Sequence, residues 1–564
     1  MNDHLNRLLT LCERQGGARG FCRQQNLHPD SRDYGALFLD DKGFAEPSTD
    51  CSFVGLLALY YHPDAQEYGQ SDLLKRSVIM MGHLLSNQNA DGTLDLRETN
   101  FHDATSAAFT VRSLWEGWLL LERFSQHTPL EDQLTSQIEA FYRRAGEGML
   151  SGGFHTPNHR WVMASALAEV WVVTGDPRLL KEVQLYLDEG IDQNPDGDYT
   201  EQSVSVYDSI VNESLITLAT LLGNEELLEY VRRNLEKLPC YLEPDGTVNT
   251  LNSRRQDYGV RAFPTCHYWS CLFLAHHDQS PFFAALAEQL LCQMEKNGVG
   301  VSFNRLMADP LYAQSLPVGQ IPVCYHRYLP HSGMLRWREE NTTLTLLKDN
   351  PVFLKYQVGG LPVLMRFCGS FYAQGQFQAG TLEPVTSPEG TVGYRMAYRR
   401  RWGYWRPMGE KAAGREWKDI PRAERKPVNQ QEYEIVVTVF PFRERLVLEV
   451  KADCRYASVP CKLELLLPPD GILESQGLYL SAKGGDFVVL RGDVRYALGG
   501  DGLQIRGGIG EHLYTETMRG SLPAAPGMTT LCCTFMTPKQ VCLELSPCSG
   551  YLDFPIEKQE DVFH

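Results

Sequence analysis

The sequence predicts an α+β multidomain protein: helical hairpins that close into a ring, an (α/α) toroid, followed by an antiparallel β-sandwich. Three observations support this prediction. Apolar residues recur with helical spacing up to about residue 300. Helix starts recur about every 50 residues, which indicates a repeat of two-helix units. After about residue 330, short apolar stretches separated by Gly and Pro indicate strands. We therefore predict domains 1–325 and 326–564.

The predicted repeat consists of pairs of helices. We place one helix of each pair near Asp50, Asp103, Pro157, Val204 and Gln256, with a second helix between successive starts, for example at 177–189 and 224–238. Every second helix of a closed ring runs in the same direction. The N-termini of the five helices are therefore expected on one rim.

One of these helices shows its ends clearly. Thr156 is a suitable N-cap and Pro157 suits the first helical position, while Trp161 and Trp171 belong to one apolar face. Gly175 then ends the helix. In the second half, the stretches 343–346, 433–439, 446–450 and 462–466 are expected to be strands of the sandwich.

Composition limits the classes of function. The chain has 564 residues, of which 43% are hydrophobic and 22% charged, so it can bury substantial cores. Its 53 Lys and Arg against 70 Asp and Glu give a net charge of −17, which argues against nucleic acid as a partner. The fifteen cysteines lack CxxC spacing and are expected to be reduced thiols.

The first turns of the predicted parallel helices carry an unusual number of polar side chains. These are Asn100, His102 and Asp103, then His155, Asn158, His159 and Arg160, then Tyr199, Glu201, Tyr207 and Asp208, and finally Arg254, Arg255, Asp257 and Tyr258. Each has a structural explanation, since Asp103 and Asp208 can be caps and Tyr207 can belong to the core. Together with several helix N-termini, however, they predict an anion-binding rim.

A second feature is the basic segment 395–426. It contains eleven Lys and Arg against four Asp and Glu, interleaved with Trp and Tyr. Such a segment suits an acidic glycan, because Arg pairs with carboxylates and aromatic rings contact sugars. The alternative is a solvated strand pair held by cation–π contacts. We expect residues 399–417 to form a long loop or hairpin that reaches toward the helical rim.

The motifs HTPNHRW (155–161) and PDGDYTEQSVSVYD (195–208) give the sequence a family resemblance. Together with the two-domain layout, they resemble the heparinase II/III-like polysaccharide lyases and the related alginate lyases. That resemblance implies cleavage of an acidic, uronic-acid-containing glycan by β-elimination, in a cleft between toroid and sandwich. It also implies that Asn158 neutralises the uronate carboxylate, His159 removes the C5 proton and Tyr207 protonates the leaving oxygen.

The remaining site residues complete this prediction. Glu201 and Asp257 are expected to orient the catalytic groups, and Arg160, Arg254 and Arg255 to supply positive charge. The expected substrate-binding residues are Asp103, His102, His155, Arg160, Arg254, Arg255, His331, Arg400, Trp402 and Trp405. The family usually adds a histidine from the sheet domain, for which His326 and His331 are the candidates.

Two alternatives remain open from the sequence. A glycoside hydrolase acting on uronosides would use a carboxylate pair drawn from Asp103, Glu201, Asp208 and Asp257. A non-catalytic glycan-binding protein would need no such pair. No GxGxxG motif follows a predicted strand and no GxxxxGK[ST] motif occurs, which argues against hydride and phosphoryl transfer.

The sequence also gives expectations about partners and location. We expect no cofactor, no metal, no membrane partner and an acidic oligosaccharide as substrate, and an oligomer is possible. The first residues show no secretory signal pattern, so we expect a cytoplasmic enzyme acting on imported oligosaccharides.

Overall fold

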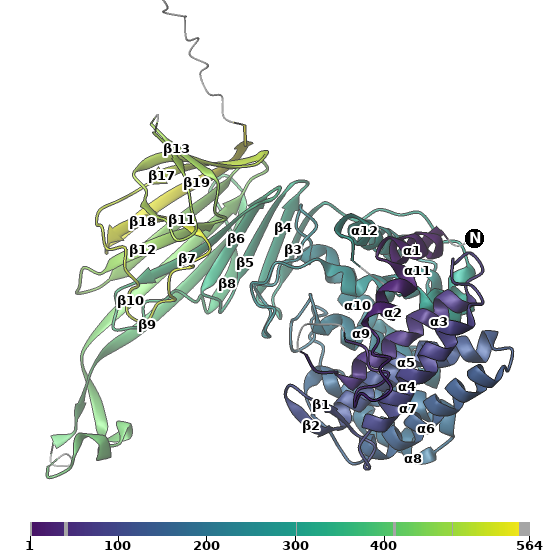
Figure 1. The fold of residues 1–564 in the computed structure, drawn as a ribbon. Helices are drawn as coiled ribbons and strands as arrows, with labels where there is room; N and C mark the ends of the chain where they lie inside the picture. Colours follow the sequence, from purple (N-terminus) through teal and green to yellow (C-terminus); the bar gives the residue numbers. More distant parts are fainter. Residues whose placement is uncertain (1–2, 39–42, 300–301, 410–412, 477, 552–564) are drawn as a thin grey trace, which may run out of the picture. The chain divides into compact units, whose positions relative to one another are not determined.

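The computed structural model describes residues 3–38, 43–299, 302–409, 413–476 and 478–551 (Figure 1). The chain divides into two compact units. The first comprises Met1–Tyr241 and Val248–Ile321, and the second comprises Leu242–Thr247 and Pro322–His564. We call them the helical unit and the sheet unit.

The helical unit consists of α-helices connected by loops and 3₁₀ turns. In chain order the α-helices are α1 (Asp3–Arg14), α2 (Gly17–Gln24), α3 (Phe53–Tyr61), α4 (Ser71–Asn87), α5 (Ala104–Phe124), α6 (Pro129–Leu150), α7 (Pro157–Thr174), α8 (Pro177–Asp188), α9 (Tyr207–Leu222), α10 (Glu226–Tyr241), α11 (Tyr268–His277), α12 (Pro281–Asn297) and α13 (Asn304–Ala308). A small hairpin of β1 (Leu94–Leu96) and β2 (Asn100–Asp103) precedes α5.

Alternate helices form an inner ring. Contacts run from α3 to α5, α7, α9 and α11 in turn. The ring closes through α1, where the His4 imidazole lies 2.9 Å from the Tyr268 hydroxyl of α11, and then through α2 to α3. Helix α7 is buried on nearly all sides from Trp161 to Val170, as expected of a helix enclosed by others. The predicted toroid is confirmed.

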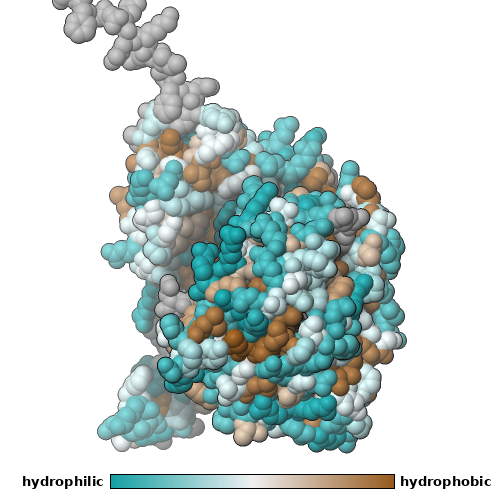
Figure 2. All heavy atoms as spheres, turned by 45° about the vertical axis from the view of Figure 1, so that its right-hand side comes forward, coloured by the Kyte–Doolittle hydropathy of each residue, from teal (hydrophilic) through white to brown (hydrophobic). Residues whose placement is uncertain are grey.

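The outer helices cover this ring and are amphipathic. Helices α8 and α10 bury apolar stripes such as Leu179, Val183 and Tyr186 of α8 and expose charged residues on the other face. Figure 2 shows hydrophilic residues over much of this face of the molecule, with hydrophobic residues exposed in patches between them. Among the described residues, none of the helices combines the length and the apolar character that a membrane span requires.

The predicted helix start near Gln256 is wrong. Residues 249–263 form a loop, and α11 begins at Tyr268, after a 3₁₀ turn (η2, Pro264–His267) that has Pro264 at its first position. The Ser253 hydroxyl donates to the Asp257 carboxylate and the Arg255 amide to the Ser253 hydroxyl. These local bonds satisfy polar groups in a non-helical conformation.

The sheet unit is formed by strands that are antiparallel apart from one pair. They are β3 (Cys324–Leu329), β4 (Met334–Glu339), β5 (Thr342–Leu347), β6 (Val352–Val358), β7 (Leu361–Gly369), β8 (Thr381–Thr386), β9 (Val392–Pro407), β10 (Arg425–Pro441), β11 (Leu446–Cys454), β12 (Pro460–Leu467), β13 (Ile472–Ser475), β14 (Leu478–Ser481), β15 (Phe487–Val489), β16 (Gly492–Leu498), β17 (Asp501–Gly508), β18 (Thr529–Met536) and β19 (Lys539–Ser549). The parallel pair is β15 and β18.

These strands form two sheets around one core. The first has the order β14-β13-β16-β17-β19-β11-β10-β9-β8 and the second the order β15-β18-β12-β7-β6-β5-β4-β3. Buried residues from both sheets, among them Phe353, Phe367, Ile435, Leu448 and Leu543, belong to the same hydrophobic core. The four predicted strand segments lie in β5, β10, β11 and β12, so the predicted sandwich is confirmed.

The long strands β9 and β10 form a hairpin over most of the basic segment. They pair from Val439 opposite Tyr394 to Arg425 opposite Pro407, with a bulge between Val428 and Gln431. Figure 1 shows that the far part of the hairpin extends beyond the sandwich. The predicted hairpin is therefore present, although residues 410–412 of the predicted range lie outside the described residues.

The segment Leu242–Thr247 belongs to the sheet unit although it follows α10 in sequence. Its Glu243 carboxylate is fully buried, 2.9 Å from Lys355 Nζ and 3.2 Å from Arg336 Nη2. Burial alone would raise the pKa of Glu243, but these two cations hold it at about 2.

All fifteen cysteines are free, as predicted.

Candidate active site

The N-terminal ends of α5, α7 and α9 and the loop before α11 bring polar side chains together on the helical unit. Asn158 and His159 lie in the first turn of α7, and Tyr207 is the first residue of α9. Glu201 precedes α9, and Arg255 lies in the loop before α11. This arrangement follows from the parallel direction of the inner helices.

Asn158 lies at the centre of the cluster. Its side chain is fully buried, and its Nδ2 donates to both carboxylate oxygens of Glu201, at 3.0 and 2.9 Å. Its Oδ1 is buried and accepts no hydrogen bond from any residue that the structure describes. A buried acceptor without a donor costs free energy.

Glu201 connects Asn158 to Arg255. The Glu201 carboxylate, which accepts from Asn158, also lies 2.9 Å from Arg255 Nη1. Burial raises the pKa of Glu201, whereas the Asn158 hydrogen bond and the charge of Arg255 lower it less strongly. The Glu201 carboxylate therefore fixes the orientation of one amide and one guanidinium.

Arg255 in turn covers Tyr207. The guanidinium carbon of Arg255 lies 4.7 Å from the centroid of the Tyr207 ring. The Tyr207 hydroxyl accepts a hydrogen bond from Gln256 Nε2 of the same loop. The Tyr207 ring is half-buried. Its hydroxyl is therefore held by Gln256 on a surface that a ligand can reach.

His159 packs between two phenylalanines. Its ring centroid is 5.8 Å from that of Phe109 and 6.4 Å from that of Phe154. Burial lowers the pKa of His159, and Arg255 lowers it further, while Asp103 opposes both. Its Nδ1 is buried, with no hydrogen-bond partner within the described ranges, so Nε2 is the nitrogen suited to exchange a proton with a ligand.

Two predicted acidic residues support the backbone of the rim. Asp103 is the N-cap of α5, since it accepts from the Thr105 amide at 2.9 Å. Asp257 is buried and accepts from the hydroxyls of Ser203, at 2.9 Å, and Ser205, at 2.8 Å. Both carboxylates therefore hold the loops that present the cluster.

Asp208 lies behind the cluster. It is buried, and its Oδ2 accepts from Asn234 Nδ2 at 3.3 Å. Burial raises the pKa of Asp208 to about 7, although the charge of Lys237 opposes this shift. Lys237 forms an ion pair with Asp198, which also accepts from the Tyr241 hydroxyl. Asp208 belongs to this buried network.

Arg160 and His155 belong to a different cluster of the same rim. Arg160 pairs with Glu189 at 2.9 Å and Asp192 at 2.5 Å, and its guanidinium lies over the Trp161 ring. His155 lies 2.9 Å from Glu189 and stacks on Tyr186. The Arg160 charge is thus satisfied by two carboxylates, away from the contacts of Asn158.

The last two predicted residues of the helical unit are exposed. His102 pairs with Asp91 at 2.6 Å, and this hydrogen bond raises the pKa of His102. The Arg254 amide donates to the Glu201 carbonyl at 3.0 Å, while its side chain is exposed. Neither side chain has a hydrogen bond to Asn158, Glu201 or Tyr207 in the part of the chain that the structure describes.

The predicted residues of the sheet unit lie at three places in it. His331 is exposed in the turn between β3 and β4, whereas the His326 Nε2 is 2.6 Å from the Tyr394 hydroxyl. Arg400 covers Tyr398 at 4.3 Å, and Trp402 packs partly against the sandwich core. Trp405, 48% exposed, lies farther along β9.

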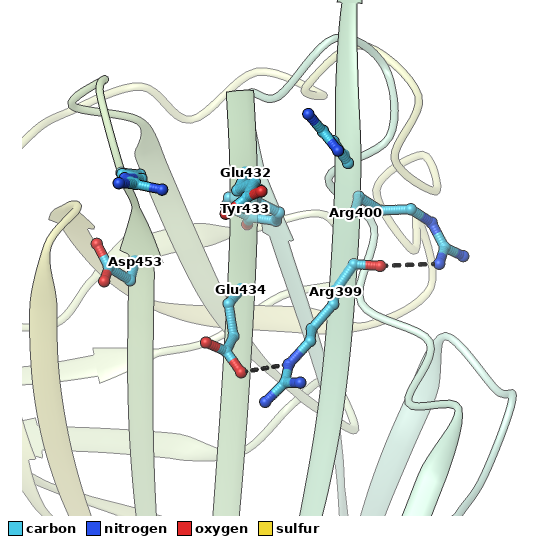
Figure 3. A pocket seen from close by; sticks show the side chains of 8 residues that line it. Arg399, Arg400, Glu432, Tyr433, Glu434 and Asp453 are labelled. Atoms are coloured by element: carbon cyan, nitrogen blue, oxygen red, sulfur yellow. Dashed lines mark hydrogen bonds and ion pairs between the residues drawn. The ribbon is translucent and has the colours of Figure 1, made fainter. Parts of the chain in front are cut away.

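Figure 3 shows the pocket beside Arg400. Arg399 pairs with Glu434 at 2.5 Å, and the lining alternates Arg399, Arg401 and Arg455 with Glu432, Glu434 and Asp453. With Arg400 the lining holds four arginines against three acidic residues, so most of its positive charge is offset by neighbouring carboxylates. The cation–π contact of Arg400 matches the alternative interpretation of the basic segment as a solvated strand pair.

Three features of the cluster escaped prediction. Gln256 contacts the Tyr207 hydroxyl, Phe154 lies against His159, and three serines bind Asp257. The position of Gln256 directly after Arg255 was the one available signal. The contacts of the serines depend on loop conformation, which periodicity does not reveal.

Comparison with known proteins identifies the fold. No protein-family model and no curated protein matches the sequence. Solved structures do match. A xanthan lyase from Paenibacillus has a TM-score of 0.57 at 10% identity, covering 96% of this chain and 57% of that chain. A heparan sulfate lyase HepC mutant from Pedobacter heparinus has a TM-score of 0.51 at 10% identity, covering 96% and 83%.

A third match has the highest identity of these. The Streptomyces coelicolor A3 chondroitin AC lyase in complex with chondroitin sulphate has a TM-score of 0.52 at 13% identity, covering 98% of this chain and 80% of that chain. The chain has the fold of the polysaccharide lyases. At these identities the likeness concerns the fold, and it agrees with the resemblance that the sequence motifs indicate.

Proposed function

We propose that this protein is a lyase that cleaves uronic-acid-containing oligo- or polysaccharides by β-elimination. The observation that carries the proposal is a chain of contacts. Asn158 contacts Glu201, and Glu201 contacts Arg255. Arg255 lies over Tyr207 and lowers the pKa of His159. The names of the structural neighbours, lyases of xanthan, heparan sulfate and chondroitin, support the same class of reaction.

Binding of the uronate carboxylate is the first requirement. The C5 proton of a uronate becomes acidic only when the adjacent carboxylate is neutralised. Arg255 Nη1 faces Glu201, and the side chain is 33% exposed, so its remaining N–H groups are available to a second carboxylate. Asn158 is fully buried and its amide donates to Glu201, so it supports this site through Glu201, which also binds Arg255.

Proton transfer is the second requirement. His159 has a lowered pKa and is therefore neutral at neutral pH, as a base must be. It takes the C5 proton, the electron pair forms the C4–C5 double bond, and the C4–O bond breaks. Tyr207 donates its hydroxyl proton to the leaving oxygen, with Gln256 fixing the hydroxyl position.

The geometry disfavours a hydrolase. Such an enzyme needs one carboxyl group to protonate the leaving oxygen and a second to act as base or nucleophile. Asp103, Glu201, Asp208 and Asp257 are at most 6% exposed, and each accepts hydrogen bonds from neighbouring residues. None of the four is presented to a ligand as a catalytic carboxylate would be.

Incubation with alginate, chondroitin sulfate, heparan sulfate and xanthan tests the proposal. We expect an ultraviolet-absorbing unsaturated uronate from at least one of them, with a mass one water below that of a hydrolysis product. Tyr207→Phe should reduce turnover by about 10²–10⁴-fold. Near-full activity of Tyr207→Phe, together with inactive Glu201→Gln or Asp257→Asn and no absorbing product, would contradict it.

The cytoplasmic location and the imported oligosaccharide substrate are further proposals that rest on the sequence pattern. Fractionation of cells expressing the tagged full-length chain tests the location.

A further inference from the structure

The β9–β10 hairpin extends beyond the sandwich as a two-stranded ribbon (Figure 1). Strand β8 pairs with β9 as far as Ala397, and β11 pairs with β10 as far as Tyr433. From there outward, the described residues of the two strands pair with each other. We call residues 399–409 and 413–432 the arm. An isolated two-stranded hairpin is only marginally stable in water, so the arm gains stability from a binding partner.

One face of the arm continues the core-facing side of the sheet. Side chains alternate between the two faces of a strand, and Met396 and Tyr398 of β9 are buried in the sandwich core. Every second residue that follows lies on the same side, together with the residue of β10 opposite the last of them. We call this set the inner arm face: Arg400, Trp402, Tyr404, Arg406 and Lys426. Trp402 is partly buried, and the other four side chains are exposed.

The two faces of the arm differ in how their charges are compensated. On the opposite face, Arg399 pairs with Glu434 at 2.5 Å, and Figure 3 shows Arg399 turned toward this carboxylate. On the inner arm face, Arg406 lies directly opposite Lys426. Neither cation forms an ion pair with a residue that the structure describes. Like charges opposite each other destabilise an antiparallel pair, so a bound anion would relieve this repulsion.

Aromatic rings lie beside these two cations. Tyr404 is 63% exposed and is adjacent to Arg406 on the inner arm face. Its ring centroid lies 5.5 Å from that of Tyr372, in an edge-to-face arrangement. Trp402, the next residue on this face, packs partly against the sandwich core. Both rings are therefore held by neighbours, which lowers the entropic cost of contact with a ligand.

This combination fits an anionic glycan. Guanidinium and ammonium groups bind carboxylate and sulfate groups, while aromatic rings cover the apolar face of a sugar. The net charge of −17 disfavours nucleic acid. A membrane surface fits less well, because Ile420 at the end of the arm is buried and Arg425 covers one side of the Trp417 ring at 4.6 Å. The described residues there provide no apolar face to insert into lipid.

We propose that the inner arm face is a second glycan-binding site, located on the sheet unit, for polysaccharides that carry carboxylate or sulfate groups. Arg406 and Lys426 bind the anionic groups, and Tyr404 contacts a sugar ring between them. The class of glycan rests on the proposed lyase function, whereas the site takes no part in the reaction. A second contact raises the effective concentration of the polymer at the enzyme.

The test measures binding apart from turnover. Alginate, chondroitin sulfate and heparan sulfate are titrated calorimetrically into the full-length Tyr207→Phe variant, with and without Arg406→Gln and Lys426→Gln together. We expect this pair of changes to weaken binding of the preferred glycan about tenfold, equivalent to about 1.4 kcal/mol, and to reduce its salt dependence. Arg399→Gln with Arg401→Gln, on the opposite face, removes the same charge and is the matched control. Its affinity should stay within about threefold.

Tyr404→Ala tests the aromatic contact separately. It should weaken binding severalfold and leave the salt dependence unchanged, because it removes no charge. Tyr456→Ala, which removes a 66% exposed ring elsewhere on the sheet unit, is its control. In the otherwise wild-type enzyme, Arg406→Gln with Lys426→Gln should raise KM for the polymer and leave kcat nearly unchanged, since the site takes no part in the reaction.

The outcomes separate this site from the lyase proposal. Equal affinities of the inner-face and opposite-face variants, or no binding of any of the three glycans, would overturn the site. So would unchanged glycan binding alongside lost binding to vesicles of phosphatidylcholine and phosphatidylserine, which would indicate a membrane partner. Glycan binding that depends on Arg406 and Lys426, in an enzyme that forms no unsaturated product, would support the site and overturn the lyase proposal alone.

Discussion

Two arginines of the helical rim have similar partners and different environments. Arg160 pairs with Glu189 and Asp192 and is 12% exposed, whereas Arg255, among the described residues, pairs with Glu201 alone and is 33% exposed. Arg160 lies over Trp161 and Arg255 over Tyr207. Both belong to the same rim, and both were predicted to bind substrate.

The difference lies in how much of each charge is already satisfied. Two carboxylates neutralise Arg160, so a substrate carboxylate gains little there. Arg255 keeps N–H donors exposed, and its one partner also holds Asn158, whose Oδ1 accepts no bond from the described residues. Arg160 Nε also lacks a hydrogen-bond partner among the described residues, but it is buried. A functional arginine is thus distinguished by donors that are exposed to a ligand rather than by its position on the rim.

Among variants of the two arginine clusters, the largest expected effect is that of Arg255→Gln. Loss of a charged donor that stabilises developing negative charge should reduce kcat/KM by about 10²–10³-fold. The melting temperature should change little, because the side chain is partly exposed and forms one ion pair. Steady-state kinetics and thermal unfolding measure both quantities. Activity within a factor of three of wild type would remove Arg255 from the site.

Arg160→Gln should show the opposite pattern. Loss of two charge-assisted hydrogen bonds, one exposed and one part-buried, should reduce the free energy of unfolding by about 1.5–3 kcal/mol. Activity below the unfolding temperature should stay within about threefold of wild type. Denaturant unfolding and kinetics on the same samples test this. A hundredfold loss of activity with unchanged stability would show that Arg160 acts in catalysis.

Glu201→Gln tests the link between Asn158 and Arg255. The variant keeps the shape of the side chain but removes the charge that holds both partners, so kcat/KM should fall about tenfold, or about 1.4 kcal/mol. Glu189→Gln is the matched control in the Arg160 cluster and should leave kcat/KM unchanged. Equal losses in the two variants would mean that Glu201 has no special positioning role.

The smallest effect concerns the pH dependence of His159. Because its pKa is lowered, kcat/KM should rise with pH through an acidic limb below the ordinary histidine value and then level off. Asp103 raises the pKa of His159, so Asp103→Asn should move this limb to still lower pH. Asn remains a good N-cap, so α5 should keep its stability. A limb that does not move would exclude His159 as the base.

Much of the fold followed from the sequence because it depends on local patterns. The repeat of apolar helices, the N-cap at Asp103 and Pro157 at the first helical position placed the inner helices within a few residues. The helix start predicted at Gln256 was wrong because residues 249–263 form a polar loop, although their apolar residues are spaced as in a helix. The contact of Asn158 with Glu201 joins residues 43 positions apart, and the two motifs placed these residues on one rim without revealing their pairing.

The sequence by itself determined the order of helices and strands and the side of the ring on which polar residues gather, because periodicity and caps act over a few residues. Only the tertiary structure decided the charge state of individual groups. Glu169 and Glu243 are both fully buried, yet burial raises the pKa of Glu169 to about 8 while Arg336 and Lys355 hold that of Glu243 near 2. Charge depends on which cations lie within a few ångströms, and these come from distant parts of the chain.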